Sequence, residues 1–226
     1  MKLVLALEAS APAYAVAVGA AEQPQAHLTS SRTDPGYAGW GDLVARTMAA
    51  AGASFTDVGL LALDIGPGGL TSIRSAVAYA NGLAFSLGLP ILPVSSLELM
   101  AMAAQQHHRG PFLCLKRGQG GNMYAGLFRD GAMIQMRHGA PGSVLPALAG
   151  DLAEICVAGA ARDEVAPFLP GVAVADAGIA EADVLVLYQA GRAAAAGSDR
   201  LVPVASPINE ASRILHEGAA GSTHRL

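Results

Sequence analysis

The order of apolar and polar positions predicts a mixed α/β chain. Three apolar or alternating runs open it, and their short connections predict consecutive antiparallel strands at Leu3–Leu7, Ala13–Gly19 and Gln25–Ser31. A helical pattern follows, in which Asp34-Pro35 can cap and start a helix through about Ala51. Glycines at 36, 39 and 41 weaken its first turn and favour a start nearer Trp40.

The stretch from Leu60 to Ser96 organises the rest of the chain. The apolar run Val58–Asp64 predicts a buried strand, and the helical spacing over Thr71–Leu87 predicts a helix that Thr71 or Ser72 can cap. Ile91–Val94 is the next expected strand, and Ser95 with Glu98 forms a capping box for a helix over 97–106. Strand, helix, strand and helix in this order indicate a parallel α/β layer.

A glycine loop joins the strand and helix of this unit. Its residues Gly66, Gly68, Gly69 and Thr71 form a candidate anion loop, because a helix N-terminus presents free N–H groups. The spacing fits neither a P-loop, which also needs a lysine, nor the G-x-G-x-x-G dinucleotide fingerprint. The structural alternative is a tight turn that lets the helix pack closely against the strand.

The second half repeats the mixture of strands and helices with weaker signals. The expected strands are Phe112–Lys116, Asn122–Arg129, Ala132–Arg137, Glu154–Gly159 and Val172–Val174. The expected helices are Pro141–Gly150, Arg162–Leu169 and Ala180–Ala196. A polar stretch at 105–110 predicts the domain boundary, which gives an N-terminal lobe at 1–108, a smaller lobe at 109–217 and a tail at 218–226.

Composition narrows the possible functions. The chain has 226 residues, 52% of them hydrophobic, and a net charge of −4. This charge argues against a surface that grips nucleic-acid phosphates. Cys114 and Cys156 lie in apolar runs and are expected to be buried free thiols. Glu8 interrupts the first apolar run, and no run reaches the roughly eighteen residues that a membrane helix needs. We therefore expect a cytoplasmic protein without membrane contact.

The segment Gly66–Ala101, GPGGLTSIRSAVAYANGLAFSLGLPILPVSSLELMA, resembles the signature of the bacterial TsaB family. In that family the loop reads GPGSFTGLR and is followed by a helix rich in small residues, a strand and VSSLEALA. The opening LVLALEAS at Leu3–Ser10 is similar to the family opening ILAIDTS. The resemblance implies the actin-like, Hsp70-like and sugar-kinase (ribonuclease H-like) ATPase fold with two small lobes.

The resemblance also implies a function. TsaB is a non-catalytic scaffold partner of TsaD in forming the N6-threonylcarbamoyladenosine modification at adenosine 37 of tRNA, with the ATPase TsaE as third component. TsaD would supply the metal and the nucleotide, so we expect no cofactor, no metal and no strong direct tRNA binding in this chain. The sequence contains neither a G-x-S-x-G elbow nor a plausible Cys–His pair, and no catalytic residue is expected.

The resemblance places the TsaD surface, which a homodimer of the isolated chain would share, on the helices 40–51 and 71–87. The residues assigned to it are Trp40, Leu43, Val44, Thr47, Ile73, Ala76, Val77, Ala80 and Leu83. Because Ala76 and Ala80 lie one turn apart on the same stripe, at least one of them is expected to face outward.

Three departures from the family keep two alternatives open. Glu8-Ala9-Ser10 replaces Asp-Thr-Ser, where the superfamily handles phosphate and metal, although a lone carboxylate is more often a turn group. Lys116 replaces an aspartate and, with Arg117 and three glycines, could form an anion site or a mobile hairpin tip. Residues 204–210 lack the family's Pro-x-Tyr-Leu-Arg ending. The alternatives are an ATP-dependent enzyme of the same superfamily and a paralogue that does not bind TsaD.

Overall fold

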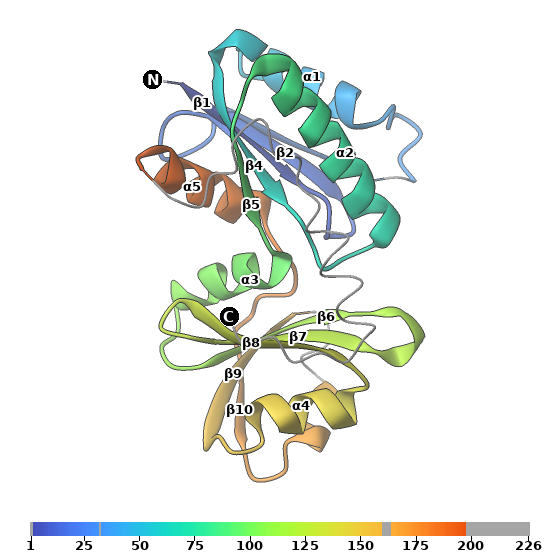
Figure 1. Ribbon diagram of the computed structural model, residues 1–226, viewed down its shortest axis with the longest axis vertical. Helices are drawn as coiled ribbons and strands as arrows, with labels where there is room; N and C mark the ends of the chain where they lie inside the picture. The colour runs from blue at the N-terminus through green and yellow to red at the C-terminus, as the bar shows by residue number, and fades with distance from the viewer. Residues whose placement is uncertain (1, 32, 160–163, 198–226) are drawn as a thin grey trace. The chain divides into compact units, whose positions relative to one another are not determined.

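The computed structural model describes residues 2–31, 33–159 and 164–197, which form two compact α/β units (Figure 1). The first unit consists of Met1–Ser95 together with the segment that begins at Asp183. The second unit consists of Ser96–Ala182. Each unit is built around its own five-stranded sheet.

The first sheet has the strand order β3-β2-β1-β4-β5. Its strands are β1 Leu3–Glu8, β2 Tyr14–Gly19, β3 Ala26–Ser30, β4 Val58–Asp64 and β5 Ile91–Val94. The first three strands pair antiparallel, whereas β4 and β5 run parallel to β1 because helices connect them. Every residue of β1 and β2 is buried, which is why these strands read as apolar runs rather than as a strict alternation.

Three helices cover this sheet. Helices α1 (Trp40–Ala50) and α2 (Leu70–Leu87) lie on one side, and α5 (Val184–Ala195) lies on the other (Figure 1). Helix α5 approaches the sheet closely at Gly191, where an added Cβ would lie 2.7 Å from Val4 Cγ1. A short 3₁₀ turn, η1 (Phe55–Asp57), precedes β4.

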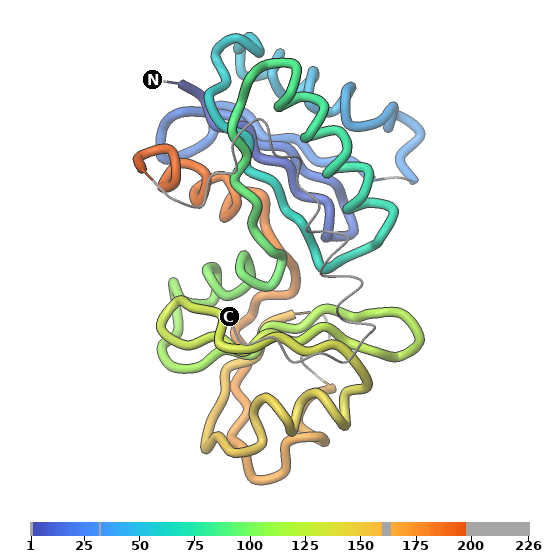
Figure 2. Tube along the Cα trace, in the orientation of Figure 1, coloured from blue at the N-terminus to red at the C-terminus, as the bar shows by residue number. Residues whose placement is uncertain are grey.

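The second sheet has the order β10-β9-β6-β7-β8. Its strands are β6 Phe112–Arg117, β7 Met123–Arg129, β8 Ala132–Gly139, β9 Glu154–Gly159 and β10 Ala173–Asp176. Helix α3 (Ser96–Gln105) covers one face, and α4 (Pro141–Ala149) covers the other (Figures 1 and 2). The turns η2 (Gln119–Gly121) and η4 (Ala166–Phe168) complete the described elements. Buried leucines, isoleucine and valines of β6, β9 and α4 form the core on the α4 side.

The two sheets share one topology. In each, the first three strands form an antiparallel meander and the last two add in parallel beside the first strand, so β6-β7-β8-β9-β10 repeats β1-β2-β3-β4-β5. This arrangement confirms the expected two-lobed ribonuclease H-like fold. The helix that follows each fifth strand joins the other unit: α3, after β5, packs on β6, β7 and β9, and α5, after β10, packs on β1 and β4.

Several boundaries differ from the sequence expectations. The units divide after Ser95, not at residue 108, because α3 packs on the second sheet. Helix α1 begins at Trp40 after Gly39, whose φ of 106° suits glycine, and Asp34 instead closes a turn by accepting a bond from Gly36 N (2.9 Å). Helix α2 has Gly69 at its N-cap without a side-chain cap, so the expected capping by Thr71 or Ser72 is wrong.

The last expected helix is shorter than its sequence pattern. Helix α5 begins at Val184, and Asp183 caps it by accepting a bond from Leu185 N (2.7 Å). Residues 204–210 and the expected tail at 218–226 lie outside the described residues, as does the beginning of the expected helix at 162–169. Among the helices of the described ranges, none is both long and apolar enough to cross a membrane.

Candidate functional site

Two buried carboxyl groups mark the edge of the first sheet where the parallel strands β1 and β4 end. Glu8 is the last residue of β1 and Asp64 the last residue of β4. The register pairs Leu7 with Leu63, which brings the next residues of both strands to the same position along the sheet. Glu8 is 1% exposed and Asp64 is not exposed. The paired carboxyls therefore lie inside the first unit.

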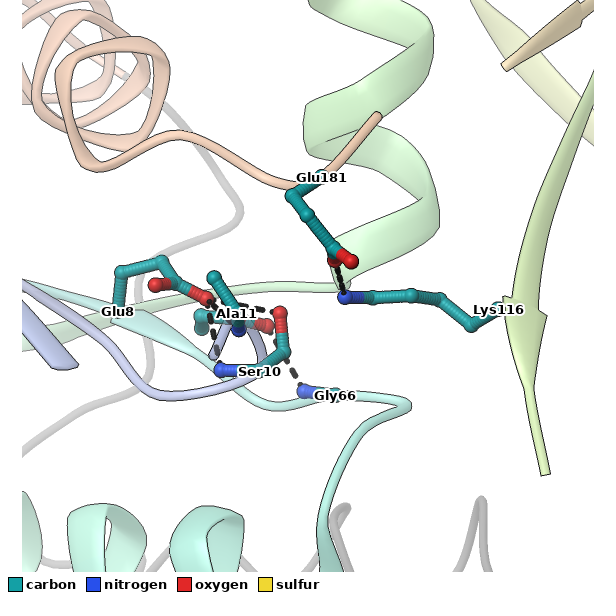
Figure 3. Close-up of polar contacts among 7 residues, drawn as sticks. Glu8, Ser10, Ala11, Gly66, Lys116 and Glu181 are labelled. Atoms are coloured by element: carbon teal, nitrogen blue, oxygen red, sulfur yellow. Dashed lines mark hydrogen bonds and ion pairs between the residues drawn. The ribbon is translucent and has the colours of Figure 1, made fainter. Parts of the chain in front are cut away.

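Each carboxyl group closes the turn that follows it, and Figure 3 shows this for Glu8. Oε1 of Glu8 accepts hydrogen bonds from Ser10 N (2.7 Å), Ser10 Oγ (2.8 Å) and Ala11 N (2.8 Å). Oδ1 of Asp64 accepts a hydrogen bond from Gly66 N at 2.8 Å. Glu8 thus fixes the β1–β2 turn, as expected for a turn group at a strand end.

The two carboxyls also act on one another. Burial is the largest cause that raises the pKa of Glu8, to about 8, and the charge of Asp64 and a hydrogen bond with its side chain raise it further. The bonds from Ala11 and Ser10 act in the opposite direction and are weaker. Glu8 is therefore mainly protonated at neutral pH.

The glycine loop passes close to the β1–β2 turn. A Cβ on Gly68 would lie 2.8 Å from Cα of Ser10, so only glycine fits at this contact. Gly66, with φ of 90°, directs its N–H at Asp64 rather than at solvent. Thr71 is exposed in the first turn of α2. The close approach at Gly68 supports the structural interpretation of the loop, in which glycines allow tight packing.

The acidic pair does not fit a divalent cation. Oε1 of Glu8 already accepts three hydrogen bonds from its own turn. Within the described ranges no group of three or more His, Cys, Asp or Glu residues is arranged to hold a metal ion. A magnesium site inherited from the superfamily is therefore not supported by the donors of this turn.

The basic pair at the end of β6 is engaged by carboxylates. Lys116 is 5% exposed, and its Nζ donates to Oε2 of Glu181. The guanidinium of Arg117 forms two bonds with Glu164, one of them Nη1 to Oε2 at 3.1 Å. Both positive charges thus have a negative partner, which argues against the anion site considered at this hairpin. Glu181 and Glu164 could not be found from the sequence, because 65 and 47 residues separate them from their partners.

The residues assigned to a docking surface lie mostly in the core. Each of them is at most 8% exposed except Leu83, which is half-buried. Neither Ala76 nor Ala80 is exposed, so the expectation that one of them faces outward is wrong. The stripe that contains them packs on the sheet, because its small side chains bring α2 close to the strands.

The opposite faces of α1 and α2 are exposed and carry small side chains. Five of their exposed residues, Ala45, Ala49, Ala78, Gly82 and Phe85, are what we call the outer helix face. Phe85 is 81% exposed, the more exposed of the two large hydrophobic side chains that are open to solvent among the described residues. The helical spacing of Ala78, Gly82 and Phe85, offset from the apolar stripe, is a sequence signal that could have indicated this face.

Comparisons with known proteins agree with the signature at 66–101. A model of the family described as TsaD, tRNA N6-adenosine threonylcarbamoyltransferase, matches residues 40–138. The tRNA threonylcarbamoyladenosine biosynthesis protein TsaB of Haemophilus influenzae is 37% identical over 67 residues, 30% of this chain and 28% of that protein. TsaB of Escherichia coli is 39% identical over 62 residues, 27% of each protein. The matched segments thus span less than a third of these curated relatives.

A solved structure extends the likeness along the chain. YeaZ from Pseudomonas aeruginosa superposes with a TM-score of 0.73 and 24% identity, covering 92% of this chain and 98% of that one. At this identity the superposition establishes the shared fold, and the curated relatives supply the family signal. Taken together, the matching TsaB segments and the shared two-lobed fold relate the chain to the TsaB (YeaZ) family, in agreement with the signature.

Proposed function

We propose that this chain is a non-catalytic subunit of the machinery that forms N6-threonylcarbamoyladenosine in tRNA, and that it acts as a scaffold for TsaD. The observation that carries this proposal is the outer helix face, which ends in the exposed ring of Phe85. The likeness to TsaB supplies the identity of the partner. The proposal is that a partner subunit covers this face in the working complex.

The composition of the outer helix face suits contact with another helix. Ala45, Ala49, Ala78 and Gly82 have little or no side chain, so a facing helix can approach closely. Phe85 offers a large apolar side chain at the end of this strip, and aromatic anchors of this kind contribute strongly to binding when a partner buries them. The net charge of −4 leaves the phosphate contacts with tRNA to the partner.

The acidic pair and the cysteines support a non-catalytic role. Glu8 and Asp64 hold their own turns, and the thiols of Cys114 and Cys156 are buried. Burial raises the pKa of both thiols, which disfavours the reactive thiolate.

Of the two alternatives, an ATP-dependent enzyme is disfavoured by the glycine loop, because the Gly66 N–H that could meet a phosphate donates to Asp64 instead. The other alternative, a paralogue without TsaD binding, makes the opposite prediction for the experiment below.

Co-purification with the TsaD of the same organism tests the proposal. We expect the wild-type chain to retain TsaD, and Ala78→Arg to lose it with an unchanged melting temperature, because Ala78 is exposed in α2. Ala193→Arg is the matched control, since Ala193 is an exposed alanine of α5. It should fold and retain TsaD. A wild-type chain that does not bind TsaD would favour the paralogue, and a fully binding Ala78→Arg would place the interface elsewhere.

The same surface is proposed to form a homodimer when TsaD is absent. Two copies of the outer helix face are self-complementary, and a twofold axis would let each cover the other. Light scattering should give a dimer for the wild type and a monomer for Ala78→Arg. Addition of TsaD should replace the homodimer by a heterodimer, to which TsaE adds as the third component. These steps belong in the cytoplasm, where tRNA modification takes place.

A further inference from the structure

The buried carboxyl pair at the ends of β1 and β4 is not used by the proposed scaffold function. Glu8 and Asp64 come from different strands, both are almost completely buried, and they lie at neighbouring positions of parallel strands. Oε1 of Glu8 accepts three hydrogen bonds, while Oδ1 of Asp64 accepts one from Gly66. Two negative charges buried at neighbouring positions of adjacent strands would repel one another strongly.

The groups around the pair supply hydrogen bonds but little positive charge. The β1–β2 turn contributes the donors of Ser10 and Ala11, and β4 contributes Asp64 as the charged group that acts on Glu8. From β2 and α2, the hydroxyls of Tyr14 and Ser72 bond to one another at 2.9 Å. Arg74 of α2 is exposed to solvent. From α5, the charge of Arg192 acts on Tyr188 instead.

We propose that Glu8 keeps its proton at neutral pH and donates it to Asp64 in a buried hydrogen bond, and that this proton is a structural part of the first unit. The proton lies between the two side chains and turns a repulsion into a hydrogen bond across the ends of β1 and β4. Glutamate at position 8 is suited to this arrangement, because its longer side chain reaches the neighbouring strand while still closing the Ser10–Ala11 turn.

The buried proton makes the stability of the fold depend on pH in a defined direction. The pKa of Glu8 is raised from 4.5 to about 8 on folding, so between these values the folded chain binds a proton that the unfolded chain has lost. This contribution is fully present below pH 4.5 and is lost as the pH rises toward 8. Over that window the folding equilibrium constant falls by about tenfold per pH unit for one proton.

Ionisation would act on the start of helix α2. Gly68 packs against Ser10, and Gly66 donates to Asp64, so the two turns held by the carboxyls are in direct contact. Helix α2 begins at Leu70, immediately after this loop. Loss of the proton should therefore loosen the β1–β2 turn and the first turn of α2 before the rest of the unit.

Carbon-13 NMR of the glutamate carboxyls, together with urea unfolding from pH 5.5 to 8.5, tests the proposal. In the wild type we expect the Glu8 signal to titrate near pH 8. Asp64→Asn should lower this midpoint, because it removes the neighbouring charge. Glu8→Gln, which keeps an acceptor for Ser10 and Ala11, should remove the tenfold-per-unit pH dependence. Glu22→Gln, at an exposed position of the same unit, is the control and should leave that dependence unchanged.

Three results would overturn the buried proton. The first is a Glu8 midpoint near 4.5 in the wild-type chain, a measurement that needs no variant to fold. The second is a midpoint unchanged in Asp64→Asn, which would mean that burial alone holds the proton on Glu8. The third is a pH dependence of unfolding that is the same in Glu8→Gln and in the wild type. None of these outcomes depends on whether the chain binds TsaD.

Discussion

Lys116 at the end of β6 donates a hydrogen bond to Glu181, which lies 65 residues later in the segment that leads to α5 (Figure 3). The lysine side chain is 6% exposed, whereas the glutamate side chain is 30% exposed. The same segment is also held by the backbone bond from Gly159 N to Ile179 O at 2.7 Å. The bond from Lys116 to Glu181 and the backbone bond from Gly159, the last residue of β9, thus fix the path of the chain between the second sheet and α5.

The two partners of this ion pair should contribute unequally to stability. Glu181→Gln leaves the buried ammonium of Lys116 without its negative partner, and we expect a loss of about 2–3 kcal/mol in the free energy of unfolding. Lys116→Met removes the buried charge and leaves Glu181 in contact with water, so its cost should stay below about 1 kcal/mol. Urea unfolding of both variants measures the difference. Equal losses, or a larger loss in Lys116→Met, would contradict a buried cation that depends on Glu181.

The sequence predicted the first unit well, because each of its elements carries a local signal. The strand Val58–Asp64 has the predicted bounds, and α2 starts one residue before the prediction. Burial was harder to predict. Ala76 and Ala80 were assigned to an interface because alanine covers little surface, but the same property lets α2 lie close to the sheet. Composition cannot distinguish these two uses of a small residue.

The repeat of the fold in the second half could not be read from the sequence. The second sheet follows the topology of the first, but the connection between its two parallel strands differs. In the first unit α2 lies between β4 and β5, whereas the described residues between β9 and β10 contain only the short turn η4. Without a second glycine loop and helix, no motif marks the repeat. The carboxyl pair depends on strand register, which places Glu8 beside Asp64 although they are 56 residues apart in the sequence. Such pairs follow from pairing between distant strands, which local patterns do not determine.

Two helical glycines should respond in opposite ways to the same substitution. A Cβ on Gly191 would lie 2.7 Å from Val4 Cγ1 and 3.0 Å from Ala62 Cβ, so Gly191→Ala should destabilise the chain by about 1–3 kcal/mol despite the better helix propensity of alanine. Gly82→Ala meets no atom within 4 Å and should stabilise by up to about 1 kcal/mol. Thermal unfolding at low protein concentration compares them. A stable Gly191→Ala would show that α5 packs less closely on β1 and β4 than described.

The inner stripe of α2 should not tolerate charge. Ala76→Arg and Ala80→Arg place a guanidinium between α2 and the sheet, where neither alanine is exposed. An unpaired buried charge costs several kcal/mol, so we expect both variants to lose cooperative unfolding or to become insoluble. Ala78→Arg, on the exposed side of the same helix, is the control and should unfold like the wild type. Circular dichroism on heating measures all three, and a folded Ala76→Arg would contradict the buried position.

Phe85 should contribute to association without contributing to the stability of the isolated chain. Its side chain is 81% exposed, so Phe85→Gln removes few intramolecular contacts and should change the free energy of unfolding by less than about 0.5 kcal/mol. If a partner buries the ring, its loss should cost more than about 1.4 kcal/mol of binding, a tenfold rise in the Kd for TsaD. Isothermal titration calorimetry measures this Kd.

A second exposed apolar residue provides the matched control for Phe85. Ile134 on β8 is 53% exposed and lies in the second unit, so Ile134→Gln should leave both stability and TsaD binding unchanged. A Phe85→Gln that binds normally while Ala78→Arg does not would keep the outer helix face and remove Phe85 as its anchor. Normal binding by both variants would contradict the face itself, because neither the aromatic end nor the small-residue middle of α2 would then meet TsaD.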